Sequence, residues 1–203
     1  MREEVVTPLR TFIAIELPEP VKEALHGLNG RLRESGARAT WVKPENMHLT
    51  LRFLGEVEAE RVEKLAAILT DACQGKPPFT LAVRGIGAFP NQRKPEVIWA
   101  GAEPLEGPLA EVRIAAENAA RAIGLPPDDK AFRAHLTLAR IRDRRAAKAL
   151  EVGGWTVGSR LREYLERERD FAAGEFTVRS VSLFSSELTP HGPVYRRLEE
   201  FPF

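Results

Sequence analysis

The sequence predicts an α+β fold, with residues 1–203 forming a single domain that has two internal lobes. Strand-like and helix-like segments alternate from one end of the chain to the other, which indicates a mixed architecture. No low-complexity linker or charge block marks a domain boundary, and 203 residues suit one domain or two small ones. A tetrapeptide that occurs twice, about half a chain apart, indicates that the two lobes are related.

The composition is that of a soluble globular protein, with 43% apolar and 29% charged residues. Lys and Arg total 30 against 29 Asp and Glu, so a uniformly basic coat is excluded while a local basic groove is not. The single cysteine, Cys73, excludes an intramolecular disulfide and a cysteine-cluster metal site. No secretory signal and no apolar run near the ~20 residues of a membrane helix is visible, so we expect a cytoplasmic protein.

Strands are predicted where β-branched and aromatic residues run between prolines or glycines, and helices where apolar residues recur at intervals of three and four. In the first helix these residues are Val21, Leu25, Leu28 and Leu32, and Gly36 follows its end. The elements expected up to residue 102 are, in order, a strand at 9–17, a helix at 19–35, a turn at 40–46, a strand at 47–55, a helix at 58–74, and strands at 79–88 and 96–102.

The second half of the chain repeats this alternation. An alanine-rich stretch predicts a helix over 105–123, which Gly124 and two prolines end. The elements expected beyond it are, in order, a strand at 134–142, a helical region from about 144 to 170, and final strands near 175–187 and 193–200. The glycines within 153–158 are expected to split that helical region.

The repeated tetrapeptide is His-Leu-Thr-Leu, at residues 48–51 and again at residues 135–138. A specified tetrapeptide of this kind should recur by accident in well under ~1% of chains of this size. Each copy lies in a strand-like run and follows a loop that contains proline or charged residues. A lone histidine in a strand is more often structural than catalytic, but two histidines in identical contexts reverse those odds.

Strand geometry gives the repeat a chemical meaning. Side chains alternate between the faces of a strand, so His48 and Thr50 share one face while Leu49 points to the other. The same holds for His135 and Thr137. If the two halves pack about an approximate twofold axis, both His/Thr faces meet across a cleft.

Two histidines and two threonines suit displacement at phosphorus. Imidazole titrates near neutrality, so one ring can act as the base toward water and the other as the acid toward the leaving oxygen. Threonine hydroxyls two residues away are rigid donors for the phosphate oxygens. Metal, serine-hydrolase and phosphate-loop signatures are missing from the sequence, so metal-free acid–base chemistry fits best. The other histidines, His26 and His191, lie in no recognisable site pattern.

These motifs resemble the two-histidine phosphoesterase superfamily and, within it, the RNA 2′,3′-cyclic phosphodiesterases, also called 2′,5′ RNA ligase-like proteins. The resemblance extends over nearly the whole chain. The stretches that carry it are residues 10–15, 41–55, 89–101, 132–140, 182–188 and 192–195.

The resemblance implies a bilobed fold, with two antiparallel-rich sheets, flanking helices and pseudo-twofold symmetry about a central groove. It implies metal-independent hydrolysis of a 2′,3′-cyclic phosphate at an RNA end to a 2′-phosphate, with no cofactor. The expected partner is RNA, with tRNA-derived ends among the candidates, and the protein is expected to act as a monomer.

The resemblance also implies a role for each matching residue. His48 matches the proton donor to the leaving O3′, and His135 matches the proton acceptor that activates water. Thr50 and Thr137 match the phosphate-holding threonines, and Arg140 matches an arginine that contacts the phosphate.

Three further residues are weighed as substrate contacts. Strict alternation places Arg140 opposite the histidine face, so it reaches the phosphate only if the strand twists or bulges near Ala139. The same alternation places Arg52 on the face of Thr50, where it is a candidate substrate contact. Tyr195 is a candidate for stacking on a base, although packing is the commoner role of such residues. The other aromatic candidates are Trp41, Phe89 and Trp99.

Other functions stay open at this point. The same site could take a small nucleotide cyclic phosphate, or could run in reverse and form a 2′,5′ bond. A non-catalytic module that binds RNA ends is the alternative from another class, but binding alone needs no matched acid and base.

Overall fold

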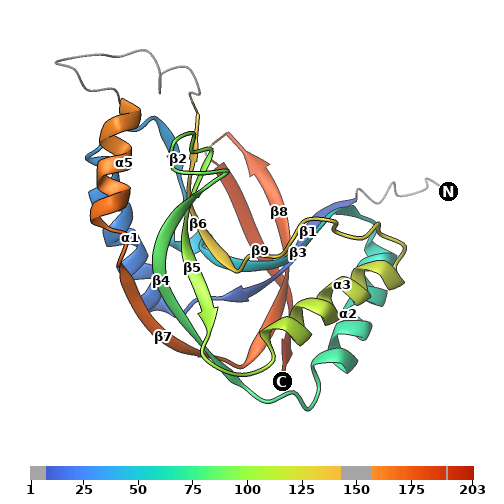
Figure 1. Cartoon of the computed structure of the whole chain (residues 1–203). Helices are drawn as coiled ribbons and strands as arrows, with labels where there is room; N and C mark the ends of the chain where they lie inside the picture. Colours follow the sequence, from blue (N-terminus) through green and yellow to red (C-terminus); the bar gives the residue numbers. More distant parts are fainter. Residues whose placement is uncertain (1–7, 143–156, 191) are drawn as a thin grey trace.

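A computed structural model of the chain describes residues 8–142, 157–190 and 192–203. Within them, nine strands form one antiparallel sheet that curls strongly, with helices packed outside both ends of the curl (Figure 1). The strands are β1 (Leu9–Glu16), β2 (Ala39–Trp41), β3 (His48–Val57), β4 (Phe79–Phe89), β5 (Val97–Pro104), β6 (His135–Ile141), β7 (Ala172–Val178), β8 (Ser180–Thr189) and β9 (Gly192–Pro202). The predicted α+β class is therefore confirmed.

The sheet consists of two wings that meet at its centre. Its strand order is β7-β4-β5-β6-β3-β1-β8-β9, and the short β2 pairs with β6 beside this path. Every neighbouring pair within a wing shares a long register, but β3 and β6 are joined through one pair, Leu49 and Leu136. The two sheets expected from the sequence are the two wings of this one sheet.

The helices cover the two wings in pairs. They are α1 (Glu19–Arg33), α2 (Ala59–Cys73), α3 (Leu109–Ala122) and α5 (Val157–Arg167). α1 packs against β7 and α5 on one wing, whereas α2 packs against β8 and β9, and α3 against β3, on the other (Figure 1). Their apolar stripes face the sheet, as in α1, where Val21, Leu25, Leu28 and Leu32 are buried.

The order of elements repeats about the central strand pair. α1 follows β1 as α3 follows β5, and β1 pairs with β3 as β5 pairs with β6. Leu49 and Leu136 are equivalent residues of the two His-Leu-Thr-Leu copies, and they face each other in an antiparallel pair. An antiparallel pair of equivalent residues has a local twofold axis between its strands. The predicted pseudo-twofold symmetry is therefore centred on the repeated motif.

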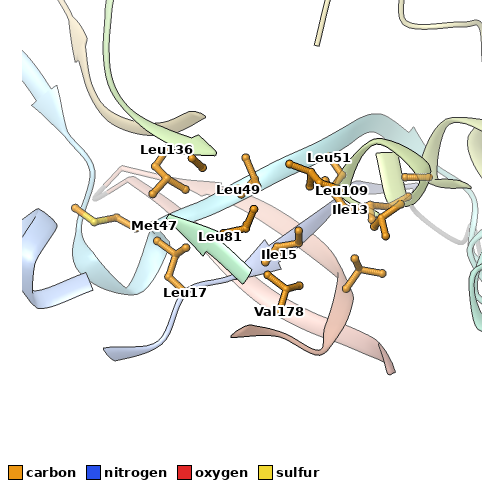
Figure 2. Packing of buried hydrophobic residues seen from close by; sticks show 14 of the residues in the cluster. Ile13, Ile15, Leu17, Met47, Leu49, Leu51, Leu81, Leu109, Leu136 and Val178 are labelled. Atoms are coloured by element: carbon orange, nitrogen blue, oxygen red, sulfur yellow. The ribbon is translucent and has the colours of Figure 1, made fainter. Parts of the chain in front are cut away.

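The core runs without a break beneath both wings. Leu49 and Leu136 are fully buried and belong to one hydrophobic cluster that includes Ile15 and Leu81. Figure 2 shows these four side chains near Met47, on the leucine side of the central strands. Truncating a leucine in such a site to alanine costs about 2–5 kcal/mol. The leucines of the repeat therefore hold the two motifs in register from below.

One strand prediction is wrong. The sequence predicts one strand over 175–187, but this stretch divides at Arg179 into β7, which pairs with β4, and β8, which pairs with β1. Val178 and Val181 are buried on either side of the division. Because the apolar pattern continues through it, periodicity cannot show that the chain changes wings. The split expected within 153–158 falls mainly outside the described residues, as does His191.

Candidate active site

A groove of about 670 Å³ lies between the wings, on the face of β3 and β6 opposite the leucines. Both wings contribute to its wall, including residues of β1, β2, β3, β6 and the β8–β9 hairpin. Its lining includes Phe12, Trp41, Lys43, His48, Thr50, Phe53, Thr137, Arg140 and Tyr195. His135 is not among the lining residues. Its position beside the other three side chains of the two motifs follows from the pairing of β3 with β6.

The central register brings the two motifs together. With Leu49 opposite Leu136, position 48 lies beside position 137, and position 50 beside position 135. Each histidine is thus the cross-strand neighbour of the other motif's threonine, at a Cβ separation of roughly 4.5–5.5 Å. Both rings are half-buried. Four side chains from two distant stretches of sequence therefore surround one point on the sheet.

Both imidazoles are held by the same hydrogen bond. His48 Nδ1 lies 2.8 Å from the carbonyl oxygen of Asn46, and His135 Nδ1 lies 2.7 Å from that of Arg133. A carbonyl only accepts, so Nδ1 carries the proton in each ring. In the neutral form Nε2 is then unprotonated. Each ring is thereby fixed with Nε2 as the atom that exchanges a proton with a substrate.

Both motifs also contain a β-bulge at the same place. In β3, Thr50 pairs with Ala14 but Arg52 with Ile13, so Leu51 is the extra residue. In β6, Thr137 pairs with Trp99 but Ala139 with Ile98, so Leu138 is the extra residue. An extra residue reverses the alternation beyond it. The fifth residue after each histidine therefore returns to the histidine face.

The bulges bring different residues to equivalent places in the two halves. Arg140 lines the groove because β6 bulges next to Ala139. Phe53 holds the matching position in β3, with 54% of its surface exposed in the groove. One half thus presents a guanidinium to the groove, and the other presents an exposed aromatic ring.

The placement expected for Arg52 is wrong. Its side chain lies on the far face, where it is 8% exposed and forms an ion pair of 2.9 Å with Glu117. It also donates a 2.8 Å hydrogen bond to the carbonyl of Phe53. The bulge at Leu51 turned the residue away from Thr50. Arg52 therefore belongs to the packing between β3 and α3 and not to the groove.

His48 is enclosed by aromatic rings from two other strands. Its ring stacks on Phe12 with centroids 4.7 Å apart and meets Tyr195 edge-on at 5.3 Å. Burial lowers its pKa to about 4, although the hydrogen bond to Asn46 acts in the opposite direction. At neutral pH the ring is therefore uncharged. His135 has a different neighbour, the ring of Phe89, in an edge contact at 5.0 Å.

The aromatic candidates divide into two groups. Tyr195 and Trp41 line the groove, whereas Phe89 and Trp99 pack on each other at 5.3 Å and are not among the lining residues. Burial raises the pKa of the Tyr195 hydroxyl, and the charges of Arg140 and Arg10 oppose that shift. Tyr195 therefore stays protonated at neutral pH, with two cations in its surroundings.

Sequence reasoning missed two residues of the site. Phe53 could have been found, because its spacing from His48 equals the spacing of Arg140 from His135. No motif or spacing in the sequence singles out Asn46, because its contacts depend on the tertiary structure. Its backbone carbonyl binds His48, and its side-chain amide donates a 2.9 Å hydrogen bond to the carbonyl of Pro193. It links the histidine to the β8–β9 hairpin, which carries Tyr195.

No group of three or more His, Cys, Asp and Glu side chains in 8–142, 157–190 and 192–203 is placed to hold a metal ion. In the same part of the chain, no helix is both long and apolar enough to cross a membrane.

Comparison with known proteins connects this geometry to a family. The family model of LigT-like phosphoesterases matches residues 15–99 and 101–195. The RNA 2′,3′-cyclic phosphodiesterase of Thermotoga maritima is 34% identical over 96% of this chain and 96% of its own. The protein of the same name from Methanothermobacter thermautotrophicus is 30% identical over 95% of this chain and 98% of its own. A crystal structure of a Thermus thermophilus protein superposes with a TM-score of 0.70 at 32% identity, covering 96% of this chain and 97% of that one.

Proposed function

This chain belongs to the LigT-like phosphoesterase family, and on that premise we propose that its groove hydrolyses 2′,3′-cyclic phosphates at RNA ends to 2′-phosphates. Family and relatives support a cyclic phosphodiesterase, an enzyme of the hydrolase class. The observation that carries the proposal is the pairing of Leu49 with Leu136, which sets the two His-x-Thr motifs side by side in opposite directions.

The two imidazoles supply the acid and the base. His135 accepts through Nε2 the proton of a water molecule, whose oxygen attacks the phosphorus atom. The P–O3′ bond breaks on the opposite side, and His48 donates a proton through Nε2 to the leaving O3′. The product keeps its phosphate on O2′, with one water added across the bond. Such proton transfers contribute about 10²–10⁴ each to the rate.

Three further side chains stabilise the charge that develops on the phosphate. Thr50 and Thr137 line the groove beside the two histidines and offer one hydroxyl each to the non-bridging oxygens. Arg140 adds a planar cation with several donors, which suits the bidentate binding of phosphate. Donors that are already aimed at developing charge are often the largest catalytic factor, at about 10²–10³ for one donor.

The low pKa of His48 constrains this mechanism. At a pKa of about 4 the ring carries no proton on Nε2 at neutral pH, so this pKa must rise before the ring can act as the acid. A phosphate anion beside the ring favours its charged form. We therefore infer that His48 takes up its proton when the substrate binds. NMR titration of His48 with and without a nucleoside 2′-phosphate measures this, and an unchanged pKa would mean that the two histidines exchange roles.

Metal-free hydrolysis is tested with an oligoribonucleotide that ends in a 2′,3′-cyclic phosphate, incubated in excess chelator. We expect full turnover to a 2′-phosphate end, with a bell-shaped dependence of kcat on pH. Loss of all activity in chelator contradicts metal independence, and a 3′-phosphate product contradicts cleavage of the P–O3′ bond. Tight binding of the cyclic end without turnover would make the protein a binding module.

Base recognition is assigned to two of the aromatic side chains on the groove wall. Phe53 offers an exposed ring to the nucleoside that carries the phosphate, and Tyr195 offers a second one beside His48. A mononucleotide cyclic phosphate could use the same contacts, so turnover of short and long substrates separates these alternatives. Reverse formation of a 2′,5′ bond is disfavoured in dilute solution, where water outnumbers any 5′-hydroxyl. Origin of the RNA from tRNA, action as a monomer and a cytoplasmic location stay predictions.

A further inference from the structure

The groove continues past the two motifs toward β2, at the end of the molecule that lies beside α1 and α5 (Figure 1). We propose that this extension binds the single-stranded RNA that precedes the cyclic phosphate, so that the enzyme prefers oligonucleotides to mononucleotides. The inference rests on the proposed function, because it assigns a course to the rest of that substrate. We call this surface the β2 lane and define it by Arg33, Thr40, Trp41, Lys43 and Arg142.

The lane is continuous with the phosphate end of the site. Thr40 is the cross-strand partner of Arg140, and Trp41 that of Ala139, so β2 extends the sheet next to the predicted phosphate-binding arginine. Thr40, Trp41 and Lys43 all line the same groove as His48 and Thr137. A chain that leaves the catalytic centre in this direction therefore stays within one cavity.

Two arginines extend the lane at its rim. The Nε–H of Arg142 donates a hydrogen bond to the hydroxyl of Thr40, which holds the guanidinium at a lining residue. The guanidinium of Arg33 lies 5.6 Å from the centre of the Trp41 ring, as in a cation–π contact. Arginines interleaved with an aromatic ring are typical of surfaces that bind single-stranded nucleic acid.

The balance of charge distinguishes the two ends of the groove. At the far end Arg10 faces Glu56 across the strand pair, and both residues line the groove, so the positive charge there is offset. Within residues 8–142, 157–190 and 192–203, Arg33, Lys43 and Arg142 form no ion pair with a carboxylate. A polyanion that leaves the catalytic centre is therefore attracted more strongly toward β2 than toward the end where Arg10 and Glu56 offset each other.

The test is binding of product RNA, which does not depend on turnover. The probe is a fluorescent octaribonucleotide that ends in a 2′-phosphate, and the competitors are a nucleoside 2′-phosphate and unlabelled two- and four-residue RNAs. We expect affinity to rise with length. In the double variant Arg33→Gln/Arg142→Gln, octamer affinity should fall about tenfold, or roughly threefold per exposed arginine. The slope of log affinity against log salt should lose about 1.4, at ~0.7 per phosphate contact.

The matched control is Arg121→Gln/Arg179→Gln, which removes the same charge from two exposed residues outside the groove. This control should bind the octamer as the unchanged protein does. Hydrolysis of a 2′,3′-cyclic mononucleotide should be the same in all three proteins. Affinity that does not depend on length, or an equal loss in the control, overturns the lane while leaving the proposed function intact. Absence of cyclic phosphate hydrolysis overturns the function, and the binding series still decides whether RNA follows the lane.

Discussion

The two His-Leu-Thr-Leu motifs have the same backbone and different surroundings. Each histidine is held through Nδ1 by the carbonyl two residues before it, and each strand bulges at the leucine after the threonine. In one half the bulge brings Phe53 into the groove, and in the other it brings Arg140. The repeated backbone thus provides a symmetric frame, on which the fifth residue after each histidine differs.

The difference extends to the histidines themselves. His48 lies between Phe12 and Tyr195, and burial there lowers its pKa to about 4, whereas His135 meets the edge of Phe89. A symmetric substrate pocket would favour no direction for the reaction. The two halves therefore share the backbone that holds each imidazole, whereas the rings packed around the two imidazoles differ.

The shared part of the comparison is tested by removing each imidazole. We expect His48→Ala and His135→Ala each to lower kcat/KM for a 2′,3′-cyclic oligonucleotide by about 10²–10⁴, since each removes one proton transfer. His26→Ala is the matched control, because His26 is exposed on α1, and it should keep full activity. If either site variant retained more than a tenth of the activity, that histidine would not be the acid or the base.

The next largest expected effect is on the free energy of unfolding, and it comes from the fourth residue after each histidine. It is Arg52 in one half, buried against Glu117, and Ala139 in the other. Arg52→Ala should lower the free energy of unfolding by roughly 1–3 kcal/mol in denaturant titration, because the carboxylate of Glu117 keeps Arg113 but loses its closer arginine partner. Arg84→Ala, which breaks an exposed pair with Glu103, should cost less than about 1 kcal/mol. A loss of activity without a loss of stability would indicate that Arg52 contacts the substrate in the groove.

The pH dependence of stability measures the environment of His48. Between pH 6.5 and about 4 the unfolded chain binds a proton at this ring that the folded chain does not. The contribution therefore favours unfolding as the pH falls through that interval, by up to about 3 kcal/mol, and vanishes above it. Denaturant titration of His48→Gln should show a flatter pH dependence than the unchanged protein. A variant that follows the unchanged protein would show that the ring is solvated, and His26→Gln controls for loss of an exposed histidine.

The smallest expected effect is on KM and comes from replacing Phe53, which holds in β3 the position that Arg140 holds in β6. Phe53→Leu should raise KM for the cyclic oligonucleotide about tenfold and leave kcat within twofold, because a base stack contributes about 1–3 kcal/mol to binding. The ring is 54% exposed, so stability should hardly change. Ile114→Ala, at 58% exposure on α3, is the control for loss of an exposed apolar side chain. An unchanged KM would mean that the base lies elsewhere, with Tyr195 as the next residue to replace.

Local pattern predicted the helices, most of the strands, the two motifs and the resemblance to the family, because apolar periodicity and turn residues act over a few positions; it missed the short β2. It also determined that His48 and Thr50 share a face with a leucine beneath them. It could not show the division of 175–187 between the wings, because Val178 and Val181 are apolar whichever strand they join.

Tertiary structure decided the rest of the site. The bulges that turned Arg52 inward and Arg140 outward arise from register with β1 and β5, and alternation along a single strand contains no information about its neighbours. The pKa of His48 depends on rings at positions 12 and 195, at opposite ends of the chain. Burial is a property of the packed molecule, so the protonation of a residue is set where distant segments meet.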